Sequence, residues 1–351
     1  MKRKDYKKQK KLSGKRLAIR VTLLLTLSLF LSVAAYAVSL QKKAVDAADR
    51  AYEVVPNRPK SDIREVKVEP ATDNVSILFI GVDDSEARSQ GDSNSRSDAL
   101  LLATLNPKNK SVKLVSIPRD SYVYIPEVGY RDKITHAHAF GGTRATIESI
   151  EGLFDIPVDY YVKMNFNAFI DVVDAIGGIE AEVPYERIEK DENDKNTIHL
   201  MPGLQHLDGK HALALARTRK LDSDVERGKR QQMILQSILK EAVSVKSITK
   251  YGDVIDAVGD NMKTDMTFDE MKSFLEYIKG GMPQVDTLSM NGYDDMSTGT
   301  YYWKLDESDL TEVKQILQSH LGLIPDSSNL TDGRSNTTDS RDEALEDILN
   351  D

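Results

Sequence analysis

The most prominent feature of the hydrophobic pattern is an uninterrupted apolar stretch near the N-terminus. Residues 21–40 read VTLLLTLSLFLSVAAYAVSL and contain no charged side chain. At a rise of about 1.5 Å per residue, a helix of this length spans about 30 Å, the thickness of the hydrocarbon layer of a bilayer. The pattern therefore predicts a transmembrane helix over residues 21–40.

Two interpretations of this stretch stay open. An uncleaved signal-anchor is favoured because the apolar run continues through Val38 and Leu40. A cleaved signal peptide is the alternative, since the sequence AYA at residues 35–37 resembles a cleavage site between small residues. Both interpretations export the residues that follow.

The charge distribution predicts the orientation of the helix. Residues 1–20 hold ten Lys or Arg side chains and one Asp, a net charge of +9, in a chain whose total is -9. Basic flanks stay in the cytoplasm, and each basic residue adds on the order of 1 kcal/mol of attraction to an anionic leaflet. We therefore expect a cytoplasmic basic tail at residues 1–20 and a single-pass type II protein of the cell membrane, with its C-terminal domain extracellular.

The hydrophobic pattern changes along the exported part. Residues 41–73 are charged, Ala-rich and then Pro-containing, which indicates a helical stalk and a linker. From residue 74 to about 322, short apolar runs alternate with segments of helical periodicity. The expected strands are 75–82, two strands within 98–120 joined by a turn at 106–110, 179–183 and 284–290. The expected helices are 143–154, 165–178, one capped by Asp208, 226–243, 267–281 and 305–322. This alternation predicts a mixed α/β sheet covered on both faces.

Composition excludes several classes of function. The chain has no Cys, which rules out disulfides, thiol catalysis and Cys-ligated zinc. The exported part carries a net charge of -18, because the first twenty residues carry +9 of the total of -9. Such a domain does not suit nucleic-acid binding, which needs a basic face. Residues 323–351 are rich in Ser, Asn, Thr and Asp and predict a disordered acidic tail.

Against this acidic background, residues 216–232 (ARTRKLDSDVERGKRQQ) stand out, with six basic and three acidic side chains. Arg217 and Arg219 are two residues apart, so they point to one side of an extended segment. Arg227, Arg230 and Gln231 share a face of the next helix's first turns. Basic residues oppose the dipole at a helix N-terminus, so this placement favours a bound anion such as phosphate. A solvated face balanced by the neighbouring acids is the alternative.

Acidic and basic residues also gather at predicted strand ends. Asp83 and Asp84 follow the first strand, and Asp98 precedes the second. Two carboxylates at neighbouring strand ends can hold Mg²⁺ together with substrate phosphates, although turn-forming roles explain them as well. Arg119, Asp120, Lys133 and His136 follow the third strand, where surface charges are the simpler interpretation. The chain contains no GxSxG, HExxH, Walker or GxGxxG motif.

Eight blocks in order give a more specific signal. Together they resemble the LytR-CpsA-Psr family of Gram-positive cell-wall enzymes over residues 74–245, with a weaker continuation to about 322. The blocks are ILFIGVD, RSDALLLATLNP, VKLVSIPRDSYV, DKITHAHAFGG, FDIPVDYYVKMNF, DAIGGIEAEVP, MPGLQHLDGKHALALARTRK and SDVERGKRQQ.

The resemblance implies a fold and an activity. The fold is an α/β/α sandwich around a mixed central sheet, here preceded by one N-terminal transmembrane helix, with a long apolar pocket for a lipid. The activity is a phosphotransferase that moves an anionic glycopolymer (teichoic acid, capsule or a related polysaccharide) from an undecaprenyl-pyrophosphate carrier to peptidoglycan. The new bond is a phosphodiester, with the C6 hydroxyl of N-acetylmuramic acid as the attacking group. The partners are therefore the lipid-linked polymer, the peptidoglycan acceptor and the membrane.

The resemblance also assigns residues. Asp83 and Asp98 are the expected ligands of Mg²⁺, with Mn²⁺ as a possible substitute. The expected diphosphate-binding residues are Arg96, Arg119, Lys133, Arg217, Arg219, Arg227 and Gln231. Of these, the four arginines Arg119, Arg217, Arg219 and Arg227 act with Asp98 in catalysis. The chain departs from the family at Val225-Glu226, where an aromatic residue and a Gly are common, so Glu226 adds an acid beside the phosphate site.

Other functions stay open at this stage. The same site could hydrolyse the polyprenyl pyrophosphate with water as acceptor, or bind the polymer without turnover. A membrane-bound transcriptional attenuator is disfavoured, because about twenty cytoplasmic residues are too few for a helix-turn-helix. No general base is identified, with Asp98 and Asp224 as candidates.

Overall fold

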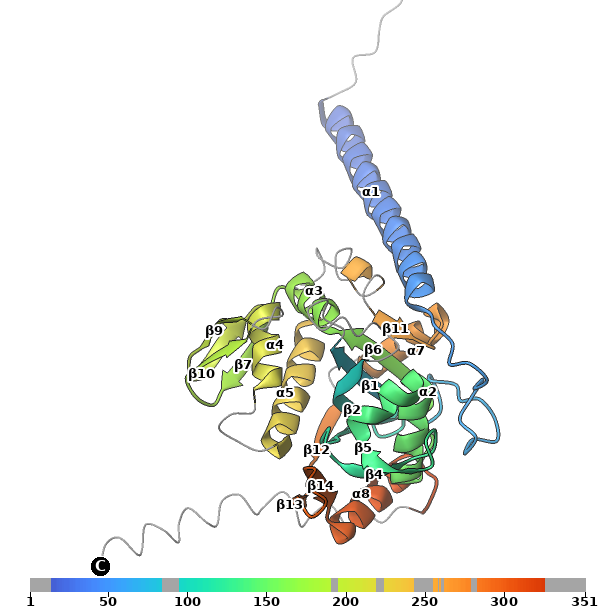
Figure 1. The fold of residues 1–351 in the computed structure, drawn as a ribbon. Helices are drawn as coiled ribbons and strands as arrows, with labels where there is room; N and C mark the ends of the chain where they lie inside the picture. Colours follow the sequence, from blue (N-terminus) through green and yellow to red (C-terminus); the bar gives the residue numbers. More distant parts are fainter. Residues whose placement is uncertain are drawn as a thin grey trace, which may run out of the picture.

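The apolar stretch near the N-terminus forms the middle of a long helix, α1, which spans Gly14–Ala51. The structure is a computed structural model that describes residues 14–83, 95–190, 195–218, 224–242, 255–257, 259, 262–278 and 283–325. Figure 1 shows α1 projecting away from the rest of the chain. Its segment Val21–Ala51 is long and apolar enough to cross a membrane, and none of its most apolar window is buried. This exposure is consistent with membrane anchoring.

A six-stranded mixed sheet forms the centre of the domain. Its strand order is β11-β6-β1-β2-β3-β12. Strands β1, β2 and β3 are antiparallel neighbours, as the short turn at residues 106–110 predicted. The pairs β1–β6 and β3–β12 are parallel, and β6–β11 is antiparallel. The strands span Val75–Asp83 (β1), Arg96–Asn106 (β2), Ser111–Ser116 (β3), Tyr160–Asn165 (β6), Met262–Thr264 (β11) and Gln284–Leu288 (β12).

Helices cover both faces of this sheet, as alternation along β1 requires. Leu78 and Ile80 pack on one face with side chains of α2 and α8. Ile77 and Phe79 point to the other face, toward α7 and α5. The result is the expected α/β/α sandwich (Figure 1). The helices span Ile134–Phe154 (α2), Phe166–Ile176 (α3), Gly209–Arg217 (α4), Asp224–Ala242 (α5), Phe268–Ile278 (α7) and Glu307–His320 (α8).

Helix boundaries follow local signals in the sequence. The Asp208 side chain accepts a hydrogen bond from the backbone N–H of His211 and caps α4. Gly177 ends α3 in the left-handed conformation, at φ 96°. Helix α2 begins nine residues before the predicted residue 143, and its backbone is non-helical at Gly141 and Gly142. The glycine pair thus separates two helical segments. The sequence predicted only the second of them, residues 143–154.

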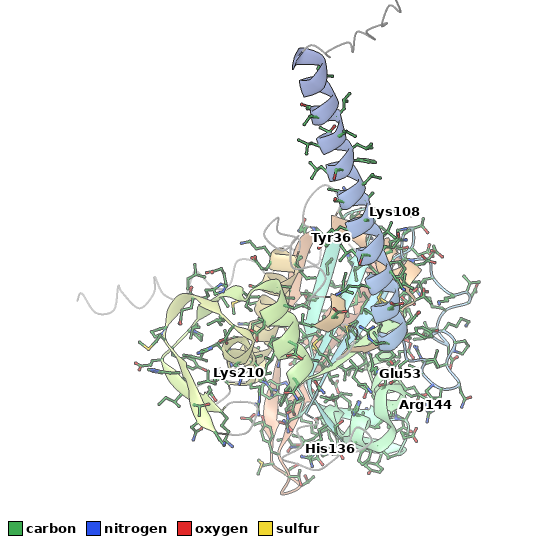
Figure 2. The ribbon with its side chains drawn as sticks, turned by 90° about the horizontal axis from the view of Figure 1, so that it is seen from above. Tyr36, Glu53, Lys108, His136, Arg144 and Lys210 are labelled. Carbon is green, nitrogen blue, oxygen red and sulfur yellow. The ribbon has the colours of Figure 1, made fainter. Side chains whose placement is uncertain are left out.

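Within the described residues, four two-stranded sheets accompany the sandwich. Three are hairpins, β4–β5, β8–β9 and β13–β14, and the fourth pairs β7 with β10 on either side of the β8–β9 hairpin. Of these strands, the sequence predicted only β7, because the others are short and expose much of their surface. Figure 1 places β7, β9 and β10 beside α4 in a small lobe apart from the sheet, and Figure 2 shows Lys210 of α4 on this lobe. The strands span Tyr122–Ile125 (β4), Tyr130–Lys133 (β5), Ile179–Val183 (β7), Arg187–Lys190 (β8), Asn196–Leu200 (β9), Gly203–Leu207 (β10), Gly292–Asp295 (β13) and Tyr302–Leu305 (β14).

The segment between α1 and the sheet is held against the domain by ion pairs. Arg64 forms a two-point contact with Asp159, at 2.9 Å from Nε and 2.8 Å from its terminal nitrogen. Arg58 contacts Glu151 at 2.7 Å. The linker expected within residues 41–73 therefore lies along the surface of the domain. Residues 1–13 of the expected basic tail and 326–351 of the expected acidic tail lie outside the described residues.

Candidate active site

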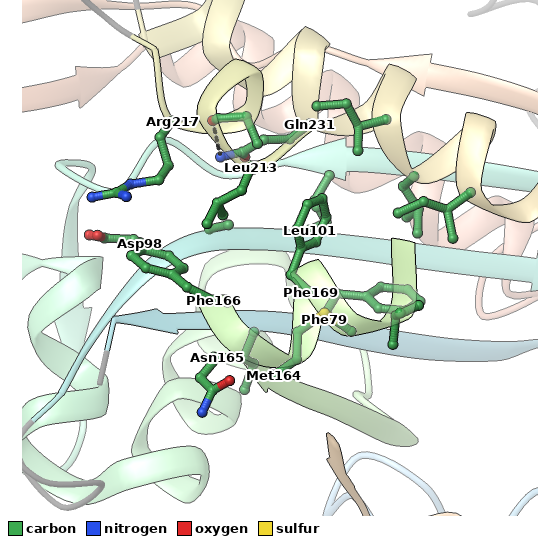
Figure 3. Close-up of a pocket in the computed structure, with 18 of the residues that line it drawn as sticks. Phe79, Asp98, Leu101, Met164, Asn165, Phe166, Phe169, Leu213, Arg217 and Gln231 are labelled. Carbon is green, nitrogen blue, oxygen red and sulfur yellow. Dashed lines mark hydrogen bonds between the residues drawn. The ribbon is translucent and has the colours of Figure 1, made fainter. Parts of the chain in front are cut away.

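A deep pocket opens between the central sheet and helices α3, α4 and α5. It encloses about 930 Å³, part of it open to solvent, and its walls are largely apolar. The apolar lining comes from Phe79, Ile80, Gly81, Ala99, Leu101, Val162, Met164, Phe166, Phe169, Val172, Leu213, Ala216, Ile234, Leu235 and Ile238. Figure 3 shows Arg217 and Asp98 converging at one end of this pocket. The pocket is therefore amphipathic along its length.

Helix α5 shows most clearly how the pocket wall changes from polar to apolar side chains. Arg227 and Gln231 line the pocket from its first turns, and Ile234, Leu235 and Ile238 continue along the same wall. From Arg227 to Ile238 the helix rises by roughly 16 Å. In Figure 1, α5 starts at the end of the domain away from α1 and runs toward the side from which α1 leaves. The apolar part of the pocket thus extends toward the anchor.

A β-bulge directs Asp98 into the pocket. Gly81 of β1 faces Ala99 of β2, but the next residue, Val82, faces Ser97, so Asp98 is the extra residue of the ladder. In a regular strand, neighbouring side chains point to opposite faces, whereas here Asp98 and Ala99 both line the pocket. The bulge therefore turns a carboxylate away from the core face and toward the helices α3 to α5.

A chain of alternating charges leads away from Asp98. The Arg119 guanidinium contacts the Asp98 carboxylate, and its Nε lies 3.7 Å from Asp120. Asp120 in turn accepts an ion pair from Lys133 at 2.8 Å. All four side chains are less than one-fifth exposed. Carboxylates thus hold Arg119 and Lys133 in a chain that starts at Asp98, the residue that lines the pocket.

Two further donors are fixed by backbone carbonyl groups. Arg227 is 6% exposed, and it donates to the Asp98 carbonyl at 2.6 Å and to the Ala216 carbonyl at 3.4 Å. Gln231 donates to the same Ala216 carbonyl at 3.3 Å. Helix α5 approaches β3 closely here, because a Cβ on Gly228 would lie 2.6 Å from the Ser116 hydroxyl. The glycine therefore sets the depth of Arg227 beside the sheet.

Arg217 approaches the site from the last residue of α4. Its guanidinium carbon lies 4.5 Å from the centre of the Phe166 ring, a cation–π geometry that orients the side chain. Thr218, which follows, is extended and ends the helix. The helix end and the aromatic ring together aim the guanidinium at the space beside Asp98 (Figure 3).

A buried polar network supports this helix end, and Glu189 and Thr218 in it were not among the residues expected from the sequence. Thr218 donates its hydroxyl hydrogen bond to Glu189 of β8, which also pairs with Arg187. Arg230 of α5 donates to the Thr218 carbonyl at 2.6 Å. Glu189, Thr218 and Arg230 are all less than 8% exposed. The small lobe thus fixes the residue next to Arg217, through partners that lie far apart in the sequence.

Comparison with known proteins identifies the family of this chain. The LytR_cpsA_psr family model matches residues 35–319. The chain belongs to the LytR-CpsA-Psr family. Among its relatives is the polyisoprenyl-teichoic acid–peptidoglycan teichoic acid transferase TagT of Bacillus subtilis, 39% identical over 269 residues, which are 76% of this chain and 83% of the relative.

Solved structures of LytR-CpsA-Psr proteins match as well. One is TagT bound to LI-WTA, with a TM-score of 0.66, 37% identity and coverage of 77% of this chain and 99% of that chain. Another is the family protein YwtF (TagT) with bound octaprenyl pyrophosphate lipid, with a TM-score of 0.63, 34% identity and coverage of 77% and 99%. The second ligand combines a long apolar chain with a diphosphate.

Several residues expected from the family motifs meet at the polar end. Asp98, Arg217, Arg227 and Gln231 line the pocket, and Arg119 contacts Asp98. Lys133 reaches the group through Asp120. Arg230, which the sequence grouped with Arg227 and Gln231, does not line the pocket. The helical rotation of about 100° per residue explains this. Around the helix axis, Gln231 lies about 40° from Arg227 in one direction, whereas Arg230 lies about 60° from Arg227 in the other direction.

The structure does not place the side chains of three other expected residues in the pocket. Arg96 is exposed at the start of β2, where its backbone pairs with that of Asp83. The backbone of Asp83 ends β1, but its side chain lies outside the described residues. Arg219 also lies outside them.

Asp98 supplies the carboxylate at the described polar end of the pocket that could take part in holding a divalent cation. Asp98 faces the space beside Arg217, and β1 brings Asp83 to the neighbouring strand end. No cluster of three or more His, Asp or Glu side chains that could hold a metal occurs within the described ranges. Mg²⁺ needs only one or two carboxylates when water and phosphate oxygens complete its shell. A cation held here would therefore draw most of its ligands from water and from a phosphorylated ligand.

Proposed function

We propose that this protein transfers an anionic glycopolymer, of the teichoic acid class or a related one, from a polyisoprenyl diphosphate carrier to peptidoglycan. The observation that carries this proposal is the amphipathic pocket, in which apolar walls end at Asp98 and a group of arginines. A long isoprenoid with a diphosphate head matches this arrangement, because its apolar chain ends in a charged group. The names of the LytR-CpsA-Psr relatives support the reaction class.

The arginines provide the electrostatic part of the reaction. Arg217 and Arg227 line the pocket, and Arg119 is held at its edge by Asp98. Guanidinium groups bind phosphate oxygens through paired N–H donors, and they stabilise the charge that grows on a leaving phosphate. Since an exported domain has no ATP, the driving force lies in the donor's own diphosphate bond.

The bond changes balance without a further reactant. The acceptor hydroxyl oxygen attacks the phosphorus that carries the polymer, and the bond from this phosphorus to the bridging oxygen breaks. A phosphodiester forms, polyisoprenyl monophosphate leaves, and the hydroxyl proton passes to water or to a carboxylate. Asp98 is the carboxylate that lines the described pocket.

We also propose that Asp98 and Asp83 hold Mg²⁺, or Mn²⁺ in its place, when the donor is bound. When present, such an ion supplies charge neutralisation at the diphosphate. Arg119 keeps the Asp98 carboxylate in position beside the pocket in the meantime.

The proposed orientation follows from the anchor and the pocket. We place residues 1–20 in the cytoplasm and the domain outside, because basic flanks stay inside. The apolar end of the pocket then faces the membrane that supplies the lipid (Figure 1). Protease added to intact spheroplasts should degrade the domain and spare the N-terminal tail.

The direct test uses the full-length protein in detergent micelles. A polyisoprenyl diphosphate-linked teichoic acid precursor is supplied with polymer-free peptidoglycan strands, and the products are analysed by mass spectrometry with Mg²⁺ or with EDTA. We expect a phosphodiester-linked polymer on the glycan and a loss of product with EDTA. Release of free polymer phosphate at the same rate with and without acceptor would instead identify a hydrolase.

A further inference from the structure

Two hairpins that are far apart in the sequence pack together beside the polar end of the pocket. The backbone N–H of Trp303 in β14 donates a hydrogen bond to the Asp120 carbonyl at 2.9 Å. Ser121 and Trp303 form an isolated parallel β-bridge. Strand β4 begins at the next residue, Tyr122. In Figure 1, β4–β5 and β13–β14 lie at the end of the domain opposite α1. These hairpins therefore extend the site away from the membrane anchor.

Five tyrosines gather on this pair of hairpins, and we call them the tyrosine surface: Tyr122, Tyr124, Tyr293, Tyr301 and Tyr302. The rings of Tyr122 and Tyr302 meet edge to face at 4.7 Å. Tyr124 lies two residues beyond Tyr122, hence on the same face of β4, and is 51% exposed. Tyr293 is 62% exposed and pairs across the hairpin with Lys304, whose ammonium lies 3.4 Å from the centre of the Tyr122 ring.

The tyrosine surface adjoins the charge chain of the active site. The Lys133 ammonium is 5.5 Å and 5.9 Å from the ring centres of Tyr301 and Tyr302. The same ammonium pairs with Asp120, which follows Arg119 in the chain. A ligand lying across the tyrosines would therefore lie beside Lys133, which joins the arginine group through Asp120.

We propose that the tyrosine surface binds the sugar strand of the acceptor and presents its hydroxyl to the polar end of the pocket. This inference rests on the proposed transfer reaction and assigns the acceptor to one surface. Sugar rings have an apolar face of C–H groups and a rim of hydroxyls, which match the face of a tyrosine ring and its phenol group. Successive exposed rings suit a polymer better than a single sugar.

The lysines of the surface are matched by carboxylates. Lys133 is matched by Asp120 at 2.8 Å, and Lys304 by Asp295 at 3.6 Å. Arg131 is exposed and pairs with Tyr124 across the hairpin, so it adds one basic group to the same face. Asp294 accepts a hydrogen bond from the Tyr301 hydroxyl at 2.8 Å. The surface therefore presents mainly aromatic rings with scattered carboxylates, phenols and one guanidinium, which suit a sugar strand with its hydroxyls better than a chain of phosphates.

The chain offers a matched control. Tyr130 is also 51% exposed and belongs to the same hairpin as Tyr124. It pairs with Ile125, which points into the core, and its ring contacts Phe140 of α2. Tyr130 therefore lies on the opposite face of β4–β5 from Tyr124. Its removal costs the same kind of side chain without changing the tyrosine surface.

The experiment measures transfer by the full-length protein in micelles while the acceptor and the donor are varied in turn. For the double variant Tyr124→Ala with Tyr293→Ala, we expect the apparent KM for peptidoglycan strands to rise about tenfold or more. The KM for the donor and the rate at saturating acceptor should stay within twofold. Tyr130→Ala should match the wild type, and Tyr124→Phe with Tyr293→Phe should keep most of the acceptor affinity, because the rings remain.

Each other outcome has a definite meaning. An unchanged KM for the acceptor, or an equal rise in Tyr130→Ala, would overturn the inference. A rise in the donor KM instead would assign the surface to the donor's polymer and also overturn it. Thermal melts show whether the double variant is folded, and if it is not, the single variants Tyr124→Ala and Tyr293→Ala, both of exposed side chains, decide the case by the same measurements. Absence of transfer by the wild type would contradict the proposed function itself, which separates the two failures.

Discussion

Two regions of the domain use the same residue types to different ends. At the base of α1, each of two arginines has its own carboxylate: Arg64 forms a fork with Asp159, and Arg58 pairs with Glu151. Both carboxylates also accept hydrogen bonds from the backbone. The N–H of Ser76 donates to Asp159, and the N–H of Val158 donates to Glu151. Charges in this region are matched one to one, and the region fastens the linker to the domain.

At the polar end of the pocket the arrangement is different. Arg217 and Arg227 line the pocket together with the Asp98 carboxylate, and Arg119 contacts both Asp98 and Asp120. Backbone carbonyls orient Arg227, and the ring of Phe166 orients Arg217. Guanidinium groups that converge beside an apolar pocket can bind an anionic ligand, whereas a fork between an arginine and a buried carboxylate holds two segments together. The comparison teaches that the placement of an arginine, and not its presence, distinguishes a binding site from a structural ion pair.

The largest effect should come from removing Arg217. Arg217→Ala should lower the transfer rate by about 10³-fold or more, because an arginine that stabilises a phosphoryl-transfer transition state is worth that much. Its melting temperature should stay close to that of the wild type, since Arg217 is a partly exposed residue at the end of α4 and not part of the core. Product formation at saturating donor, followed together with a thermal melt, checks both parts. A variant that keeps full activity would remove Arg217 from the mechanism.

The opposite result is expected at the base of α1. Arg64→Ala leaves the Asp159 carboxylate buried at 2% exposure without its fork, which should reduce the free energy of unfolding by about 3–5 kcal/mol. The transfer rate per folded molecule should change little. Chemical denaturation and activity measured at a temperature where the variant is folded make the test. A strong loss of activity without a loss of stability would break the comparison.

A smaller effect should follow from the network beneath Arg217. Glu189→Ala removes the acceptor of the Thr218 hydroxyl, so the end of α4 should shift and kcat should fall by about tenfold to a hundredfold. Glu189→Gln keeps an acceptor oxygen and should restore much of the rate. A purely structural role predicts that the two variants lose stability but keep the kcat of the wild type, which distinguishes it from positioning.

The smallest effect concerns a carboxylate that interrupts the matched region. Burial raises the pKa of Asp265 to about 6, although the N–H of Tyr161 donates to it and the charge of Arg58 opposes the shift. Because the folded protein holds this proton more tightly than the unfolded chain, the stabilisation is present below about pH 4 and is lost as the pH rises to about 6. Asp265→Asn should remove this loss.

The two proteins should therefore differ most above pH 6. There we expect Asp265→Asn to be more stable than the wild type by on the order of 1–3 kcal/mol. The difference between their free energies of unfolding should shrink as the pH falls toward 4. An unchanging difference over this range would mean that Asp265 does not titrate as its burial implies.

Much of the fold followed from local patterns. The strand ending at Asp83, the hairpin turn at residues 106–110 and the caps at Asp208 and Gly177 all lie where sequence signals place them. These signals work because they depend on neighbouring residues only. The ordered motifs also named Asp98, Arg119, Arg217, Arg227 and Gln231, which the structure brings to one pocket end or its edge. The structure places these side chains, while the catalytic, diphosphate-binding and metal-binding roles assigned to the site residues stay predictions.

The remaining features depend on contacts that local patterns do not encode. The bulge at Asp98 exists only in the register between β1 and β2. The role of Arg230 depends on Thr218 lying beside α5, and that of Glu189 on the small lobe folding back onto α4. The hairpin β13–β14 reaches Asp120 across about 180 residues of chain. A search for buried acids near predicted helix ends would have been the available signal for Glu189, but burial itself is a tertiary property.

The sequence by itself determined the apolar anchor, the alternation of strands and helices and the chemical types at the site, because hydrophobic period and charge are carried by each segment alone. Only the tertiary structure decided which charges pair along the linker and which converge beside the pocket. That outcome depends on distance and exclusion of water between segments, and both are set when the sheet, the helices and the hairpins pack together.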